Sequence, residues 1–163
     1  MKFFLITLNI LLILTGCATK NAFTKFDMTE EQELSASSLQ SNKITSDNRV
    51  EGVMSALYLN EIFSKSFHEN EYFFVSFYVK EKREMHNPNT LDAITSTLRL
   101  NSKLPLKIKE LPHDNQFSHL VSIKNTWNRY YLVAFEKEQA QRLSLVLENG
   151  QSSSAELVFQ KDE

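Results

Sequence analysis

The sequence predicts an all-β protein, an immunoglobulin-like antiparallel β-sandwich of about seven or eight strands that follows a flexible N-terminal tether. After Arg49, short apolar runs with a period of two alternate with polar breaks, which is the pattern of half-buried strands joined by turns. The chain has 163 residues, of which 42% are apolar, so it suits one domain with a single core.

The segment 18–48 is polar and carries only isolated apolar residues. Such a segment buries too little apolar surface to offset the entropy of ordering it, so we expect a tether. Thr29 and Gln32 have the spacing of a capping box, which indicates a short helix over about 30–39 that would be marginal in isolation.

Eight strands are expected after the tether. The run 72–79 is apolar on both faces, which favours a central strand with Phe77 in the core. The predicted strands are 54–59, 72–79, 94–100, 104–109, 117–124, 130–135, 143–147 and 155–159.

The strand at 104–109 is expected at an edge of the sheet. Leu104, Leu106 and Ile108 alternate with Pro105 and two lysines, which places the apolar set on one face. Proline cannot donate to a ladder and lysines deter further pairing, so the other face protects the edge.

The last two strands should form a hairpin, and its register is open. A two-residue turn at Asn149-Gly150 would set leucines opposite polar residues. A three-residue loop pairs Leu143 with Leu157, whereas a five-residue loop pairs Leu145 with Leu157 and Leu143 with Phe159. Because one face must be buried, the register that gathers apolar residues should prevail.

The N-terminus has the order of a secretory signal: a positive start, an apolar run over 3–14, and small residues before a cleavage point. Leu14-Thr15-Gly16-Cys17 resembles the bacterial lipobox, and Cys17 is the only cysteine. The resemblance implies cleavage before Cys17, diacylglycerol on its thiol and an acyl group on its new amine. We therefore expect a signal peptide at 1–16, a lipidated tether at 17–48 and the sandwich domain at 49–163.

The expected address is the cell envelope, anchored in the lipid bilayer through Cys17. Ala18 follows the cysteine, which by resemblance to the enterobacterial sorting pattern favours the outer membrane, facing the periplasm. With a formal charge of −2, nothing in the composition suggests a nucleic-acid partner. The expected partner is another envelope protein or an envelope polymer.

The sequence shows no enzyme signature. Only Gly52 and Gly150 follow the leader, which excludes a Gly-rich phosphate loop as a motif, and no cofactor is expected. His113, Asp114 and His119 are candidate zinc ligands for an alternative hypothesis, a periplasmic metal-dependent enzyme. The leading interpretation of that segment is a turn, so we predict no metal site.

Two pairs of residues are candidate partner contacts. Trp127 and Arg129 belong, with Tyr130 and Tyr131, to an aromatic and basic cluster typical of binding hot spots. The favoured interpretation is that the aromatic residues of this strand fill the core. Phe63 and Phe67 are four residues apart, which places them together on a helical turn, either capping an open end of the sandwich or contacting a partner.

We therefore predict a non-enzymatic envelope lipoprotein that acts as a binding or assembly module. A specific form of this hypothesis is an accessory lipoprotein of a secretion or pilus machine, because the size, lipobox and closing strands are loosely similar to the β-sandwich lipoproteins of type VI secretion. A ligand carrier would instead require a cavity inside a closed barrel.

Overall fold

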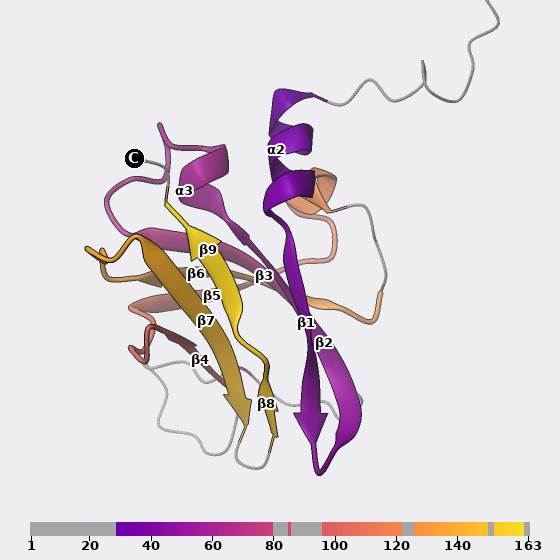
Figure 1. The fold of residues 1–163 in the computed structure, drawn as a ribbon. Helices are drawn as coiled ribbons and strands as arrows, with labels where there is room; N and C mark the ends of the chain where they lie inside the picture. The colour runs from indigo at the N-terminus through magenta and orange to yellow at the C-terminus, as the bar shows by residue number, and fades with distance from the viewer. Residues whose placement is uncertain (1–28, 80–84, 86–95, 122–125, 150–151, 162–163) are drawn as a thin grey trace, which may run out of the picture.

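A computed structural model describes residues 29–79, 85, 96–121, 126–149 and 152–161. In this part of the chain, nine strands form one antiparallel sheet, which confirms the all-β prediction. The sheet curls so that its two halves face each other (Figure 1). The strands are β1 (Gln40–Ser46), β2 (Arg49–Tyr58), β3 (Glu71–Val79), β4 (Thr97–Leu100), β5 (Lys107–Leu111), β6 (Arg129–Phe135), β7 (Arg142–Asn149), β8 (Ser152–Ser154) and β9 (Leu157–Gln160).

The strand order is β4-β7-β8-β1-β2-β3-β6-β5, with β9 paired to β7. The main core lies between the two halves of the sheet, with β1, β2, β3 and β6 on one side and β4, β7 and β9 on the other. β3 lies between β2 and β6, and Phe77 is buried in this core, as the sequence predicted.

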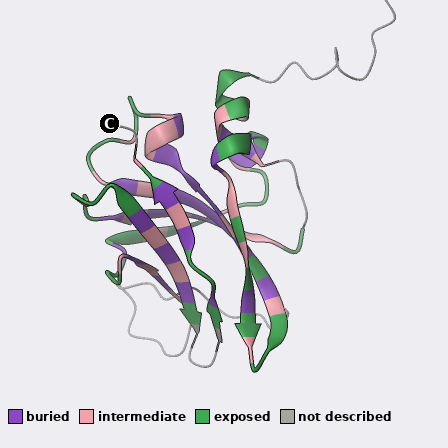
Figure 2. Ribbon diagram, in the orientation of Figure 1, coloured by how far each residue is buried: buried purple, intermediate pink, exposed green. Residues whose placement is uncertain are grey.

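A second apolar cluster covers the outer face of β2, β3 and β6. Helices α2 (Glu30–Ser38) and α3 (Leu59–Ile62) and the short 3-10 helix η2 (Ser118–Leu120) contribute to it or lie against it. Figure 1 shows α2 and α3 at the same end of the sheet, and Figure 2 shows buried positions along the strands beneath them. Both faces of β3 are therefore buried, which explains its uninterrupted apolar sequence.

The predicted tether is wrong for the part of it that the structure describes. The capping box at Thr29 and Gln32 is present and starts α2, and Leu34 packs against the second cluster. Residues 40–46 form β1, which pairs with both β2 and β8 and buries Ile44 in the main core. The sandwich therefore begins before residue 49. Residues 1–28, including Cys17, lie outside the described part.

A two-residue turn joins β1 to β2. Asp47 and Asn48 adopt φ values of 46° and 61°, and Ser46 pairs with Arg49 across the turn. Positive φ at both central positions is the geometry of the hairpin turns whose twist matches that of the strands, and Asp and Asn tolerate it. Asp47-Asn48 is therefore the local sequence feature that indicates a hairpin, and with it a strand before residue 47.

The edge position of β5 is confirmed, but its predicted length and facing are not. The strand begins only at Lys107, Leu104 and Leu106 are exposed, and Pro105 is buried. Leu104 and Leu106 belong to the connection between the two edge strands, so the alternation of the strand does not extend to them.

The predicted strand at 117–124 is also wrong in its described part. Phe117 and Leu120 are buried, but through a 3-10 helix that packs against the second cluster. Apolar residues three apart fit a helical turn as well as a strand of this length.

The closing hairpin combines two registers. Leu145 pairs with Leu157 and Leu143 with Phe159, which confirms the register of a five-residue loop. Nearer the turn, Asn149 pairs with Ser152. Residues 155–156 separate β8 from β9 and absorb the shift between the two registers, so that the apolar residues of β9 face the core.

Candidate functional site

A buried ionic cluster lies at the end of the sandwich that carries α3. Glu71 begins β3 and has no exposed surface. Its Oε1 accepts hydrogen bonds from Lys161 Nζ at 2.7 Å and from the Glu138 backbone N–H at 2.9 Å. Its Oε2 accepts one from the Tyr58 hydroxyl at 2.5 Å. The carboxylate is therefore fully desolvated but well paired.

The strand pattern places these side chains together. Glu71 is in phase with Phe73 and Phe77, so it faces inward, and Tyr58 at the end of β2 is in phase with Met54. Lys161 directly follows β9, where its backbone N–H donates to the Gln141 carbonyl at 2.9 Å. Three distant segments thus meet at one carboxylate.

The cluster shifts the pKa values of two of its members. Burial raises the pKa of the Tyr58 hydroxyl far above its ordinary range, and the hydrogen bond to Glu71 adds to this. Burial by itself would also raise the pKa of Glu71. Hydrogen bonds from Lys161, Tyr58 and the Glu138 N–H outweigh that effect and hold the pKa below its ordinary value of 4.5. Glu71 is therefore ionised at neutral pH.

An open cleft of about 410 Å³ lies against this cluster, and we call it the end cleft. Lys161, 16% exposed, and Lys137, 50% exposed, both line it. Lys137 Nζ donates to the His68 carbonyl at 3.0 Å and lies 4.0 Å from Glu71 Oε2. The lining residues are Tyr58, Asn60, Glu61, Ser64, Phe67, His68, Lys137 and Lys161.

The loop that leads into β3 is fixed beside the end cleft. The Asn60 side chain donates to the Asn70 carbonyl at 2.6 Å and accepts from the Tyr72 N–H at 2.8 Å. The Ser38 hydroxyl donates to Glu61 Oε1 at 3.0 Å, which ties the end of α2 to α3. Asn60 and Glu61 thus hold the wall of the cleft in place.

Phe63 and Phe67 follow α3, and the Phe67 N–H donates to the Phe63 carbonyl at 2.9 Å. Both rings are half-buried against the second cluster, with centroids 6.4 Å apart, and Phe67 also packs on Tyr72 at 5.0 Å. The two rings therefore pack over the outer face of the sheet, and Phe67 in addition lines the end cleft.

Trp127 and Arg129 lie away from the end cleft. Arg129 begins β6, whereas Phe135 at its other end pairs with Glu71, so the strand separates Arg129 from the cleft by about 20 Å. Arg129 forms a two-bond ion pair with Glu110 at 3.0 and 3.1 Å, and its guanidinium lies 5.5 Å from the centroid of the Tyr131 ring. Trp127 is 73% exposed.

Tyr130 and Tyr131, the other aromatic members of that sequence cluster, are both buried. Tyr131 belongs to the main core and Tyr130 to the second cluster. The interpretation that this strand fills the core is therefore confirmed for the two tyrosines, and Trp127 is the aromatic residue that stays on the surface.

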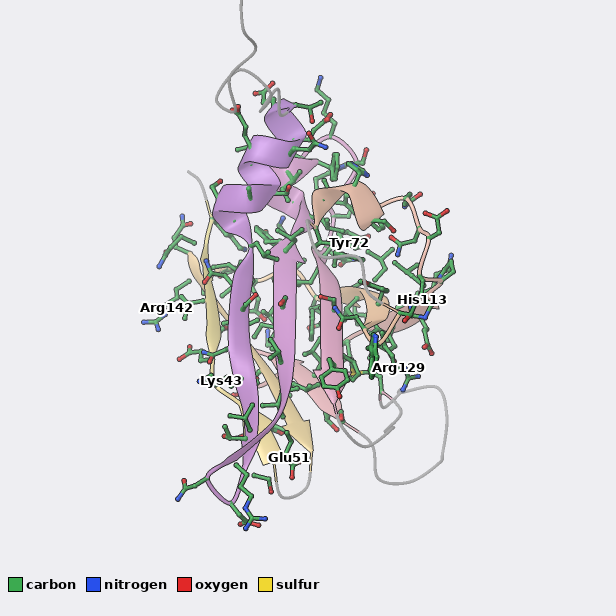
Figure 3. The ribbon with its side chains drawn as sticks, turned by 90° about the vertical axis from the view of Figure 1, so that its right-hand side faces the viewer. Lys43, Glu51, Tyr72, His113, Arg129 and Arg142 are labelled. Atoms are coloured by element: carbon green, nitrogen blue, oxygen red, sulfur yellow. The ribbon has the colours of Figure 1, made fainter. Side chains whose placement is uncertain are left out.

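The proposed zinc ligands do not gather. His113, Asp114 and His119 are exposed, and His113 packs edge-on against Tyr130 at 5.9 Å. Within the described ranges, no three His, Cys, Asp or Glu side chains come together as a potential metal-binding group. Asn115 caps its loop instead, donating to the Pro112 carbonyl and accepting from the Phe117 N–H, as expected of a turn. Figure 3 shows His113 and Arg129 along one side of the molecule.

Sequence reasoning missed Glu71, Tyr58 and Lys161 as site residues. The sequence does carry a signal for two of them, because side chains two residues apart on a strand share a face. Glu71 is two residues before Phe73, and Lys161 is two residues after Phe159, so both are expected on the inward face. A charged residue in the inward phase at a strand end marks a buried charge that needs a partner.

No family model, curated protein or solved structure matches this chain. In the part of the chain that is described, no helix is long and apolar enough to cross a bilayer.

Proposed function

We propose that this chain is a lipid-anchored lipoprotein of the cell envelope that acts as a non-enzymatic binding module, with the end cleft as its ligand site. The anchor rests on the resemblance of Leu14-Thr15-Gly16-Cys17 to the lipobox. The binding role rests on one observation, which is that a fully buried carboxylate, Glu71, holds Lys161 at the wall of an open cleft.

Stability alone is a poor reason to retain such a cluster. Taking a carboxylate and an ammonium out of water costs several kcal/mol per ion, and well-packed apolar replacements of a buried pair are often neutral or stabilising. Perturbed ionisable groups beside a cleft are, in contrast, typical of binding and active sites. This contrast favours a role in recognition for the charges of Glu71 and Lys161.

The anchor is tested by replacing Cys17 with serine in cells of the source organism supplied with radiolabelled palmitate. We expect the wild type to carry the label and to sediment with the outer membrane. The Cys17→Ser chain should carry no label and should be soluble or remain an uncleaved precursor. Equal labelling of the two chains would contradict the proposal, and serine at the neighbouring Ala18 is the matched control.

A second contact surface is proposed at Trp127, for another envelope protein or polymer. Exposed Trp residues are enriched at binding hot spots, and Trp127 is exposed by 73%. A photo-crosslinking amino acid at position 127 should give a discrete adduct in intact cells, whereas the same group at the exposed Lys43 of β1 should not. Identical adduct patterns at the two positions would contradict a specific contact.

A further inference from the structure

We infer that the end cleft binds a small organic carboxylate, with Lys137 and Lys161 as its cationic contacts. This inference names the ligand class of the binding role proposed above and rests on it. It follows from the hydrogen-bonding capacity of the two ammonium groups, from the charges around them and from the side chains beside them.

The two lysines retain donor capacity in the cleft. An ammonium group carries three N–H donors. Lys161 Nζ uses two of them on Glu71 Oε1 and the Glu138 carbonyl, and Lys137 Nζ uses one on the His68 carbonyl. The 4.0 Å between Lys137 Nζ and Glu71 Oε2 is an ion-pair distance but too long for a hydrogen bond. Donors from both groups are therefore left for an anionic ligand.

Glu71 acts as a positioning residue for these donors. Its two oxygens already accept from Lys161, the Glu138 N–H and Tyr58, while two ammonium groups lie within 4.0 Å of it. Glu71 accepts a hydrogen bond from Lys161 alone of the two lysines, and Lys137 Nζ instead donates to the His68 carbonyl. A ligand carboxylate that contacts both lysines would accept their remaining N–H donors, in a site partly shielded from solvent where charge-assisted hydrogen bonds are strong.

The remaining lining fits an organic rather than an inorganic anion. Phe67 contributes aromatic surface and is held by its contact with Tyr72. A volume of about 410 Å³ is at the small end of the range for ligand pockets, which suits a carboxylate attached to a compact apolar group.

Glu61 limits the charge of the ligand. Its carboxylate lines the same cleft and is held at 3.0 Å by the Ser38 hydroxyl. A single carboxylate is attracted by the two lysines and repelled by Glu61, and a second negative charge on the ligand would add to this repulsion. Removing the charge of Glu61 should therefore strengthen the binding of a monocarboxylate.

The test uses the full chain in a non-ionic detergent and two probes of the same shape, 3-phenylpropionate and its uncharged amide. Binding is followed by saturation-transfer NMR titration, with a urea midpoint measured for each variant as the folding control. The variants are Lys137→Gln, Lys161→Gln and Glu61→Gln, and Lys109→Gln on the edge strand β5 is the matched control. Because Lys137 is half exposed, Lys137→Gln remains informative if Lys161→Gln fails to fold.

We expect the acid to bind saturably and the amide at least about tenfold more weakly, since a charge-assisted hydrogen bond is lost. Lys137→Gln should weaken binding of the acid about tenfold, and Glu61→Gln should tighten it about twofold, an increase that a loss of folding cannot produce. Lys109→Gln should leave it unchanged. Equal binding of acid and amide, or no effect of Lys137→Gln, would overturn the carboxylate assignment but leave a ligand cleft. No binding of either probe would overturn this inference and leave the anchoring proposal, which is tested separately through Cys17.

Discussion

Lys161 and Glu71, 90 residues apart in the sequence, form an ion pair of 2.7 Å in which the carboxylate has no exposed surface. The pair joins the end of β9 to the first residue of the central strand β3. It therefore ties the C-terminal strand to the middle of the sheet and at the same time forms the wall of the end cleft.

Replacing Lys161 with methionine should be strongly destabilising, because it leaves the Glu71 charge buried without its cation. Breaking a buried pair in this way costs about 3–5 kcal/mol. Lys137→Met is the control: Lys137 is half exposed and 4.0 Å from the carboxylate, and exposed pairs contribute about 0–1 kcal/mol. Urea denaturation measures both, and equal losses would mean that Lys161 is not the partner of Glu71 in solution.

The contribution of Glu71 to the free energy of unfolding should decrease as the pH is lowered. Its pKa in the folded protein is below its ordinary value of 4.5, so its contribution is fully present above about pH 4.5 and is lost as the pH falls through the folded pKa. Glu71→Gln resembles the protonated state. The difference in unfolding free energy between wild type and Glu71→Gln, measured from pH 7 to pH 3, should therefore narrow below pH 4.5. A difference that widens there would contradict the lowered pKa.

Residues 40–46 should behave as part of the domain and not as a tether. Ile44→Ala removes a buried side chain from the main core and should cost about 2–5 kcal/mol. Lys43→Ala changes the neighbouring exposed residue and should alter stability by less than about 0.5 kcal/mol. Thermal or urea unfolding of both variants is the measurement, and a silent Ile44→Ala would show that β1 is not docked in solution.

The sequence predicts the fold where hydrophobic alternation is strong and fails where another effect replaces it. β3, β6 and β7 follow from their alternation, and so does the apolar register of Leu143 and Leu145. β1 has one buried apolar residue, Ile44, in a polar run, because its place in the sheet depends on pairing with β2 and β8. Backbone hydrogen bonds between strands do not require apolar side chains, so the hydropathy pattern does not reveal β1.

The candidate site was harder to predict than the fold. Trp127 and Arg129 stand out by composition, yet one is an exposed aromatic residue and the other is paired with Glu110. Glu71 and Lys161 are ordinary surface residue types that become a site only because the curled sheet brings the start of β3 beside the end of β9. Long-range contact of this kind depends on topology, which a single sequence does not specify.

The two aromatic residues Phe77 and Trp127 should differ greatly in their effect on stability. Phe77 is buried in the main core and stacks on Tyr131 at 5.3 Å, so Phe77→Ala should cost about 3–5 kcal/mol. Trp127→Ala should cost less than about 0.5 kcal/mol because the side chain is 73% exposed. Denaturant titrations of the two variants decide this, and equal losses would remove Trp127 as a candidate contact surface.

The most direct test of the central claim, that the buried ion pair serves binding more than stability, is the affinity of the double variant Glu71→Gln/Lys161→Met for 3-phenylpropionate. This variant removes both charges, and the amide introduced by Glu71→Gln keeps an oxygen as acceptor for the Glu138 N–H. Since removing a buried pair together is often neutral, we expect a stability within about 1 kcal/mol of the wild type. We expect the double variant to bind 3-phenylpropionate at least about tenfold more weakly than the wild type does. Wild-type affinity in a stably folded double variant would contradict the claim.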